Sequence, residues 1–282
     1  MSSLDYKYTF NAITERFCQV KVVDHNNKRE IDTIQVSIRD YSLLIQAGRR
    51  VPPLVADLID IAIAVSLADR MSIRRGDMPC RIEVSLPVRQ LDVLSKSDIQ
   101  EKFQDILQWY TGDIWSIEFT KRVGHNRKSE MQICFNEGAQ FPTTVALWSG
   151  GLDALAGVYH QLSLDLASHH TLISTGSNLM IHKAQRDVAA GIRNKFPNRT
   201  QLIQIPYYLN NTGSYAKDSA LRSRGFVFIL LGSACACLLG QSSLHIYENG
   251  VGAINLPFTR AEVGLDHARS VHPLSLYYMS GL

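Results

Sequence analysis

The chain has 282 residues, of which 45% are hydrophobic and 20% charged, a composition that can bury a core and excludes disorder as the main state. Lys and Arg number 29 against 26 Asp and Glu, an excess too small to indicate nucleic-acid binding by itself. The N-terminal segment lacks the basic stretch and apolar run of a signal peptide. The five cysteines form no CxxC pair, which favours reduced thiols and a cytoplasmic protein.

The first half of the chain alternates apolar and polar residues with period two in four places. This pattern is typical of half-buried strands, which we expect at Cys18–Val22, Ile34–Ile38, Cys80–Leu86 and Trp115–Phe119. A first helix is expected to open at Pro52 and Pro53, with Asp57 and Asp60 near its start. Its apolar residues recur at helical spacing as Leu54, Leu58, Ile61 and Val65.

A second helix of this half is expected to begin at Ser97, because Gln100 follows three residues later in the pattern of a capping box. The polar run Gly124–Glu130 predicts a hairpin loop, and Pro142 with the preceding Asn-Glu-Gly marks a boundary. Strands with two helices on one face indicate a small α+β domain over residues 1–140. Its charged residues are expected on a solvated face, such as Arg49, Arg50, Arg74 and Arg75.

From Thr143 onward, apolar runs alternate with helical segments. We expect strands at Val145–Trp148, Thr171–Ser174, Gln201–Ile205 and Leu244–Tyr247, and helices at Leu152–Leu162, Met180–Lys195 and Arg222–Leu239. This order predicts an α/β domain over residues 141–282, with a parallel sheet that binds ligands beyond the carboxyl ends of its strands.

The segment Gly225–Gly240 has 16 residues without a charge. A membrane-spanning helix needs roughly 20 apolar residues, so we expect a helix buried in the protein core and no membrane association. Cys235 and Cys237 lie in this segment, and we expect both to be core residues rather than zinc ligands.

The loop after the first strand of the second half carries the chemistry. It reads Ser149-Gly150-Gly151-Leu152-Asp153 and opens a helix. Two glycines let the backbone approach a ligand closely, and amide groups at a helix N-terminus bind anions. Ser149 adds a hydroxyl donor, and Asp153 could hold the Mg²⁺ that accompanies a polyphosphate. Neither the Walker pattern nor GxGxxG applies, and the alternative is a plain strand–helix turn.

The SGGLDA segment resembles the PP-loop of the ATP pyrophosphatase superfamily, whose pattern is SGGxDS. The resemblance implies a Rossmann-like α/β domain that cleaves ATP between the α- and β-phosphates and transfers AMP to a substrate oxygen. It also implies that this loop binds the pyrophosphate portion. Ala154 replaces the second serine of the pattern, so one hydroxyl contact is lost. We expect this loss to affect the rate of the reaction more than the binding of ATP.

Further segments are similar to 7-cyano-7-deazaguanine synthase, and more closely to its relatives in bacterial anti-phage islands (Qat-type and some cyclic-nucleotide systems). They are Asp57–Arg70, Leu221–Phe226 and Glu248–Asn255. The resemblance implies an adenosine-side loop at Thr175, Gly176 and Ser177. It implies acceptor or metal contacts at Glu248, Asn249 and Gly250, and closure of the pocket by Arg269 and His272.

Arg222 and Arg224 stand just before the apolar helix, where we expect catalytic donors that meet the charge built up in phosphoryl transfer. The alternative for this pair is a solvent-facing position, and for Glu248 and Asn249 it is capping of their loop. The alternative for His272 is a structural role. The cysteine cluster that holds zinc in the synthase is absent, so the expected cofactors are ATP and Mg²⁺, with no structural zinc.

Three functions remain open from the sequence. The first is an ATP-dependent, ligase-type enzyme that adenylates a carboxylate or amide-type acceptor, which the resemblance implies is a 7-deazaguanine, free or attached to a protein. Defence-system proteins are then possible partners. The second is a tRNA-modifying PP-loop enzyme, against which the weak net charge argues. The third is a catalytically degraded, nucleotide-binding scaffold, which Ala154 and the missing zinc ligands would mark.

Overall fold

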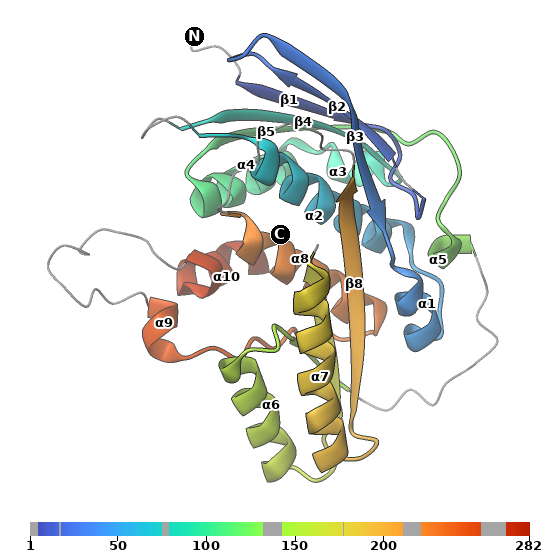
Figure 1. The fold of residues 1–282 in the computed structure, drawn as a ribbon, viewed down its shortest axis with the longest axis vertical. Coiled ribbons are helices and arrows are strands. Elements are labelled where there is room, and N and C mark those ends of the chain that lie inside the picture. The colour runs from blue at the N-terminus through green and yellow to red at the C-terminus, as the bar shows by residue number, and fades with distance from the viewer. Residues whose placement is uncertain are drawn as a thin grey trace, which may run out of the picture.

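The computed structural model describes residues 5–16, 18–74, 79–131, 143–176, 178–210, 221–254 and 269–282. They form an α/β protein around one mixed, mostly parallel sheet (Figure 1). Its strands are β1 (Tyr6–Phe10), β2 (Cys18–Asp24), β3 (Arg29–Ile38), β4 (Arg81–Val88), β5 (Ile114–Lys121), β6 (Thr144–Leu147), β7 (His170–Gly176) and β8 (Thr200–Asn210). The helices are α1 (Tyr41–Ala47), α2 (Pro53–Met71), α3 (Leu91–Leu94), α4 (Ser97–Thr111), α5 (Lys128–Met131), α6 (Leu152–Leu164), α7 (Leu179–Lys195), α8 (Arg224–Leu238), α9 (Gly250–Ile254) and α10 (Pro273–Ser280), with the 3₁₀ turn η2 (Arg269–Val271).

The sheet runs continuously through both halves of the chain in the order β5-β4-β1-β2-β3-β8-β7-β6. Strands β6, β7 and β8 are parallel, and an isolated parallel bridge between Ala146 and His245 adds a ninth position beside β6. The halves meet where β3 pairs antiparallel with β8, from Gln35 opposite Asn210 to Ile38 opposite Tyr207. The division into domains 1–140 and 141–282 stays a prediction, since its boundary lies outside the described residues.

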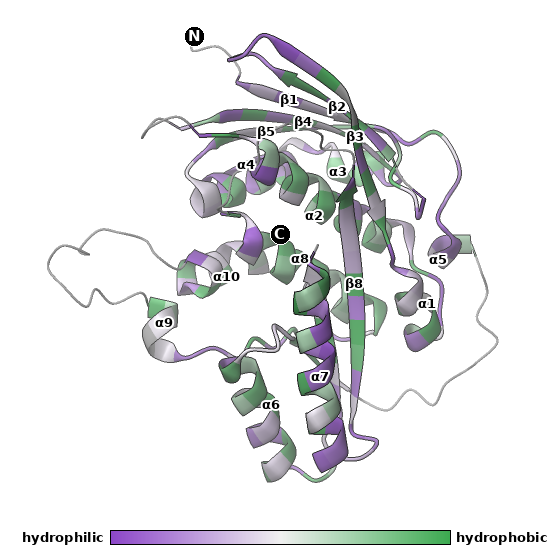
Figure 2. Cartoon of the chain, in the orientation of Figure 1, coloured by the Kyte–Doolittle hydropathy of each residue, from purple (hydrophilic) through white to green (hydrophobic). Residues whose placement is uncertain are grey.

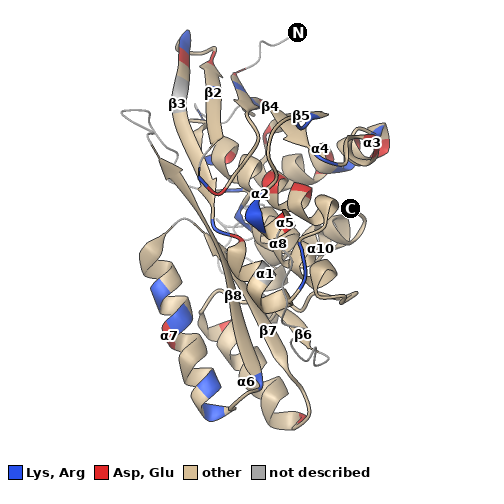
Figure 3. Cartoon of the chain, turned by 90° about the vertical axis from the view of Figure 1, so that its right-hand side faces the viewer, with Lys and Arg blue, Asp and Glu red and all other residues tan. Residues whose placement is uncertain are grey.

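Helices cover both faces of the parallel strands. Helix α7 packs against β7 and β8, whereas α8 packs against β6, β7 and α2; Figure 3 shows α7 and α8 on opposite sides of β8. In Figure 2, α2 is largely hydrophobic, while α7 presents many hydrophilic residues. This difference follows from position, because α2 lies between the sheet and other helices and α7 has one face in water.

The expectation of a buried apolar helix is confirmed by α8, in which Phe226, Leu231 and Cys235 are inaccessible to solvent. No helix among the described residues has both the length and the apolar character needed to cross a membrane. Cys237, however, is exposed, so its prediction as a core residue is wrong. Residues two apart on a helix point in different directions, and only Cys235 faces the core.

The period-two segments of the first half are confirmed as β2, β3, β4 and β5, and the parallel strands as β6, β7 and β8. The predicted strand Leu244–Tyr247 does not form, and only His245 pairs with the sheet, in one isolated bridge to Ala146. His245 alone extends the sheet: its N–H donates to the Val145 carbonyl at 2.8 Å, and its own carbonyl accepts from the Leu147 N–H at 2.9 Å. The residues after His245 leave the sheet edge and line the site described below.

Helix α4 begins at Ser97, but the predicted capping box does not form. The N-cap is Lys96, whose side chain makes no capping hydrogen bond, so Ser97 already lies inside the helix.

Helix α2 is also more buried than one apolar stripe would require. Leu54 of that stripe is exposed, while Ile59, Ile63 and other residues outside it are fully buried.

Charged residues predicted to face water are buried in pairs. Arg127 has no exposed surface and its guanidinium donates to Asp40 at 2.7 Å and to Asp60. The polar run Gly124–Glu130 therefore does not form an open hairpin loop: its end enters the interior and continues into α5. Asp57 and Asp60 are fully buried ion-pair partners of Arg89 rather than solvated helix-start residues.

Arg74, expected on a solvated face, is buried against the carboxylates of Asp69 and Asp113. A charged residue is expected on the surface because burying its charge costs desolvation energy. Pairing with an opposite charge offsets part of that cost, so a paired residue such as Arg74 can be buried. Arg50 is exposed and Arg49 partly exposed. Arg75 lies outside the described residues.

Replacing Arg127 by methionine should destabilise the fold by about 3–5 kcal/mol, because Asp40 and Asp60 would lose a buried counter-charge. Burial already raises the pKa of Asp40 even with Arg127 beside it. Urea unfolding followed by circular dichroism measures the loss. The control is Arg50→Met at an exposed position, expected to change stability by less than about 0.5 kcal/mol; equal midpoints for both variants would contradict this account.

Candidate functional site

A buried tryptophan at the end of β6 fixes the loop between β6 and α6. Trp148 is fully buried, and its indole N–H donates to the Gln185 carbonyl of α7 at 3.0 Å. Its backbone N–H donates to the Ile173 carbonyl of β7 at 2.8 Å. The loop is thereby fixed at the carboxyl end of the parallel strands, where α/β proteins bind ligands.

Gly150 must be glycine for a backbone reason. Its φ is +75°, a conformation that side chains with a Cβ rarely adopt. A Cβ at this position would also lie 3.1 Å from the Cα of Gln185. The turn therefore brings the chain against α7 and then directly into α6.

The side of the loop that faces solvent carries donors suited to an anion. Gly151 is the N-cap of α6, and its N–H donates to the Ser149 hydroxyl oxygen at 3.1 Å. The first turn of a helix leaves amide groups without intrahelical partners, at the positive end of the helix dipole. Leu152 is 78% exposed, so it would contribute through its backbone.

Two carboxyl groups meet beside this loop. Asp153, in the first turn of α6, accepts a hydrogen bond from the Asn249 amide at 3.3 Å. Burial first, and then the adjacent carboxyl of Asp153, raise the pKa of Glu248. The sequence-predicted residues Asp153, Glu248 and Asn249 are thus brought together, although they come from different segments, and Gly250 begins α9 next to them.

These oxygen ligands fit Mg²⁺, which proteins hold with one or two carboxylates together with substrate phosphates. A shared cation would also relieve the repulsion between Asp153 and Glu248. The described residues contain no group of three or more His, Cys, Asp or Glu arranged for a metal. A metal here would therefore take its remaining ligands from water and from the nucleotide.

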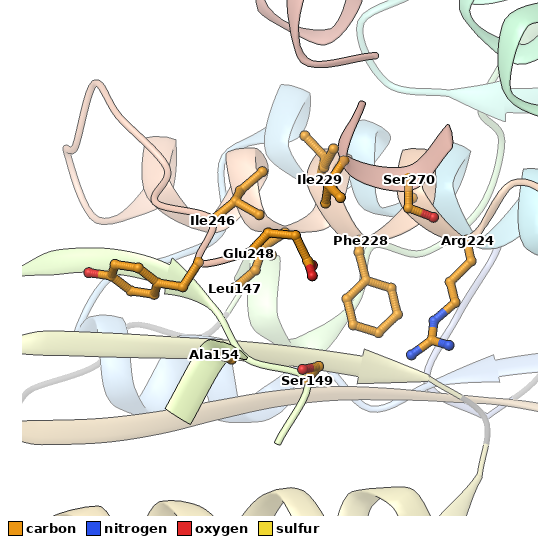
Figure 4. A pocket seen from close by; sticks show the side chains of 12 residues that line it. Leu147, Ser149, Ala154, Arg224, Phe228, Ile229, Ile246, Glu248 and Ser270 are labelled. Atoms are coloured by element: carbon orange, nitrogen blue, oxygen red, sulfur yellow. The ribbon is translucent and has the colours of Figure 1, made fainter. Parts of the chain in front are cut away.

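A cavity of about 310 Å³ opens beside the loop. Figure 4 shows the ring of Phe228 between the carboxyl of Glu248 and the guanidinium of Arg224, with Ser149 below them. The guanidinium carbon of Arg224 lies 5.4 Å from the centre of that ring. The walls also include apolar side chains; the lining residues are Leu147, Ser149, Ala154, Arg224, Gly225, Phe228, Ile229, Ile246, Tyr247, Glu248, Ser270 and Val271. Apolar walls with a few converging polar groups are typical of small-molecule sites.

Three of the sequence-predicted residues point elsewhere. The guanidinium of Arg222 donates to the Thr111 carbonyl at 3.2 Å, at the end of α4. Arg269 lies over the ring of Trp109 at 5.2 Å and donates to that residue's carbonyl. His272 caps α10, its Nδ1 accepting from the Leu274 N–H at 3.1 Å. The contact of Arg222 ties the segment before α8 to α4, and the contacts of Arg269 tie η2 to the same helix. None of the three residues lines the cavity.

The predicted adenosine-side loop ends the neighbouring strand β7. The Thr175 hydroxyl donates to the Ile205 carbonyl at 2.8 Å, so it holds β7 to β8 rather than reaching the cavity. Gly176 has a φ of +139°, and its carbonyl lies 2.9 Å from Nε2 of His182. Ser177 lies outside the described residues.

Tyr247, Phe228 and Ser270 line the cavity, but sequence reasoning did not select them. The Tyr247 ring occupies the space that a Cβ on Gly157 would need, and its hydroxyl lies 3.1 Å from Nε2 of His170. A glycine inside a helix is the one sequence signal for such a close approach. These contacts fix the segment that presents Glu248.

Acid should weaken the structure through His170. Burial, and next the charge of His245, lower the pKa of His170 from 6.5 to about 4. Between these values the unfolded chain binds a proton that the folded chain does not, so stability falls as the pH falls from about 6.5 to about 4. Urea unfolding across this range should show His170→Gln losing less stability than the parent, by up to about 3 kcal/mol. Parallel losses in the two proteins would contradict this assignment.

Comparison with known proteins does not extend this picture. No protein-family model matches the chain, and no curated protein or solved structure matches it either. The assignment of function therefore depends on the geometry of the loop, the paired carboxyls and the cavity.

Proposed function

We propose that this protein is an ATP-dependent adenylating enzyme of the PP-loop type, which cleaves ATP to AMP and pyrophosphate. One observation carries the proposal. The glycine loop at the carboxyl end of β6 enters α6 beside a cavity that also contains Arg224 and Glu248. An anion-binding turn, a cation and a pair of carboxyls within one site match what a Mg²⁺-bound triphosphate requires.

In this proposal each group has a distinct task. The amides of the loop and of the α6 N-terminus bind the β- and γ-phosphates, and Ser149 adds a hydroxyl. Asp153, with Glu248 beside it, would hold Mg²⁺, which offsets phosphate charge when bound. Arg224 is exposed at the cavity, over the ring of Phe228, where its guanidinium would meet charge that develops on the leaving pyrophosphate in the transition state. Positioning and electrostatics do most of the catalysis.

The cavity bears on the class of acceptor. Its walls combine the flat ring of Phe228 and the side chain of Ile229 with the polar groups of Glu248 and Ser270. A small ring compound that carries a carboxylate or amide suits this combination, and a 7-deazaguanine, free or attached to a protein, belongs to that class. A role in anti-phage defence follows from the resemblance of the sequence segments and is part of the same proposal.

Reaction with ATP, Mg²⁺ and a panel of carboxylated 7-deazaguanines should release one pyrophosphate for each AMP transferred to the acceptor. With ammonia or water to displace AMP from the adenylated carboxylate, free AMP should appear in the same amount. Ion-exchange chromatography resolves the nucleotides, and a coupled assay measures pyrophosphate. A Gly150→Ala protein is the control for contaminating ATPases. ADP as the only product would overturn the proposal in favour of a kinase or a simple ATPase.

The second candidate is a nucleotide-binding scaffold without turnover. Ala154 favours it, because this residue lines the cavity where the superfamily pattern has a serine, and its methyl group donates no hydrogen bond. The scaffold binds ATP without consuming it. Tight ATP binding together with no AMP release for any acceptor would favour the scaffold over the enzyme.

A further inference from the structure

We propose that Asp69, at the C-terminal end of α2, is a positioning residue that holds Arg224 in the cavity by anchoring the start of α8. The proposal deepens the function proposed above and rests on it for the role of Arg224. Asp69 is not among the residues that line the cavity, so it would act through the helix that it holds.

The anchor is a pair of short hydrogen bonds to one residue. Asp69 is fully buried, and its Oδ2 accepts from the Ser223 backbone N–H at 2.7 Å and from the Ser223 hydroxyl at 2.8 Å. Ser223 is the N-cap of α8, and Arg224 is the first residue of that helix. Both donors to Oδ2 of Asp69 thus belong to the residue that immediately precedes Arg224.

Ser223 does not behave as an ordinary N-cap. A serine at this position usually accepts a hydrogen bond from an amide of the first turn, but Ser223 makes no such bond. Its hydroxyl donates to Asp69 instead. A carboxylate from α2 therefore stands at the positive end of α8, where negative charge is favourable, and ties the two helices together.

The carboxylate is fixed from its other side. Oδ1 of Asp69 accepts from Arg74, whose Nε donates to Asp113 at 3.0 Å. Asp113 in turn accepts from the Cys80 backbone N–H at 3.0 Å. Buried hydrogen bonds thus connect Ser223 to the backbone just before β4. A chain of buried polar contacts of this kind is rigid when all its members are satisfied.

The first turn of α8 has little room to shift. A Cβ on Gly225 would lie 2.5 Å from the Cα of Ser270, so α8 and η2 are in backbone contact at the cavity wall. Loss of the Asp69 anchor should therefore move Arg224 and Ser270 together. The hydrogen bonds of Asp69 go to Ser223 and Arg74 and not to the loop glycines, so its substitution should leave the loop intact.

A double-mutant cycle tests this coupling. Binding of Mg²⁺-pyrophosphate is measured by calorimetry for the parent, Asp69→Asn, Arg224→Ala and the double variant. We expect Asp69→Asn to weaken binding by at least about threefold when Arg224 is present and by less than about 1.5-fold when it is absent, since contacting residues that act through one another are not additive. Equal losses in both backgrounds would overturn the proposal, because a general structural defect does not depend on Arg224.

Asp57→Asn is the matched control. Asp57 is also a fully buried carboxylate that accepts two backbone N–H groups and one arginine, but its partners are Arg89 and Gln90, away from α8. It should lower stability without coupling to Arg224. Ser223→Ala, which keeps the backbone bond to Asp69, gives a milder variant with a smaller coupled loss if Asp69→Asn folds poorly.

Hydrogen exchange separates failure of this inference from failure of the proposed function. In the ligand-free protein, Asp69→Asn should speed exchange in the peptide covering residues 221–230, and Asp57→Asn should not. Absence of pyrophosphate binding by the parent would refute the proposed function and leave exchange to decide on the anchor. Unchanged exchange in that peptide would refute the anchor, whatever the parent binds.

Discussion

Replacing Gly150 by alanine should weaken ATP binding by about tenfold while the helices and sheet stay folded. Gly150 has a φ of +75°, and a Cβ there would lie 3.1 Å from the Cα of Gln185. Alanine in this conformation costs roughly 1–3 kcal/mol, and about 1.4 kcal/mol is a factor of ten in affinity. The loop relieves this strain by changing the turn that presents its amides, so the strain appears as lost affinity.

Calorimetry with Mg²⁺-ATP measures the affinity, and circular dichroism monitors the fold. Gly191→Ala is the matched control, because Gly191 lies inside α7 and a Cβ there meets no atom within 4 Å. That change should leave ATP affinity unaltered and should slightly favour the helix. Unchanged affinity in Gly150→Ala would remove the loop from the nucleotide site.

The parallel strands and their helices were predictable because their sequence signals are local. Apolar runs bounded by turn residues marked β6, β7 and β8, and SGG after β6 marked the loop. The pairing of β3 with β8 was not predictable, since strand pairing between distant segments depends on the whole fold and leaves no trace in either segment alone. The sequence therefore indicated the elements of both halves, but not that they share one sheet.

The charged residues show the same limit more sharply. Arg127, Arg74 and Asp60 read as surface residues in the sequence, yet each is buried with partners distant along the chain. Arg222 and Arg224 read as one pair, because both precede the same helix. Their surroundings differ only in the folded structure, where Arg222 contacts the end of α4 and Arg224 lines the cavity.

Arg224→Ala should lower turnover by at least about tenfold with a smaller change in ATP affinity. Its guanidinium lies at the cavity, over Phe228, where it would meet charge that grows as the bond between the α- and β-phosphates breaks. A donor used mainly in the transition state affects rate more than ground-state binding, and loss of one such donor costs roughly 10²–10³-fold in known cases. Steady-state kinetics together with ATP calorimetry separates the two effects.

Arg222→Ala is the control that the structure supplies for this experiment. It removes the same charge two residues away, from a side chain that is also exposed but donates to the Thr111 carbonyl. We expect turnover within about twofold of the parent, because an exposed charge outside the cavity contributes little. Equal losses in the two variants would mean that the net charge near the site matters, rather than a placed donor. A loss in Arg224→Ala confined to ATP affinity would make Arg224 a ground-state phosphate ligand, and its catalytic role would be withdrawn.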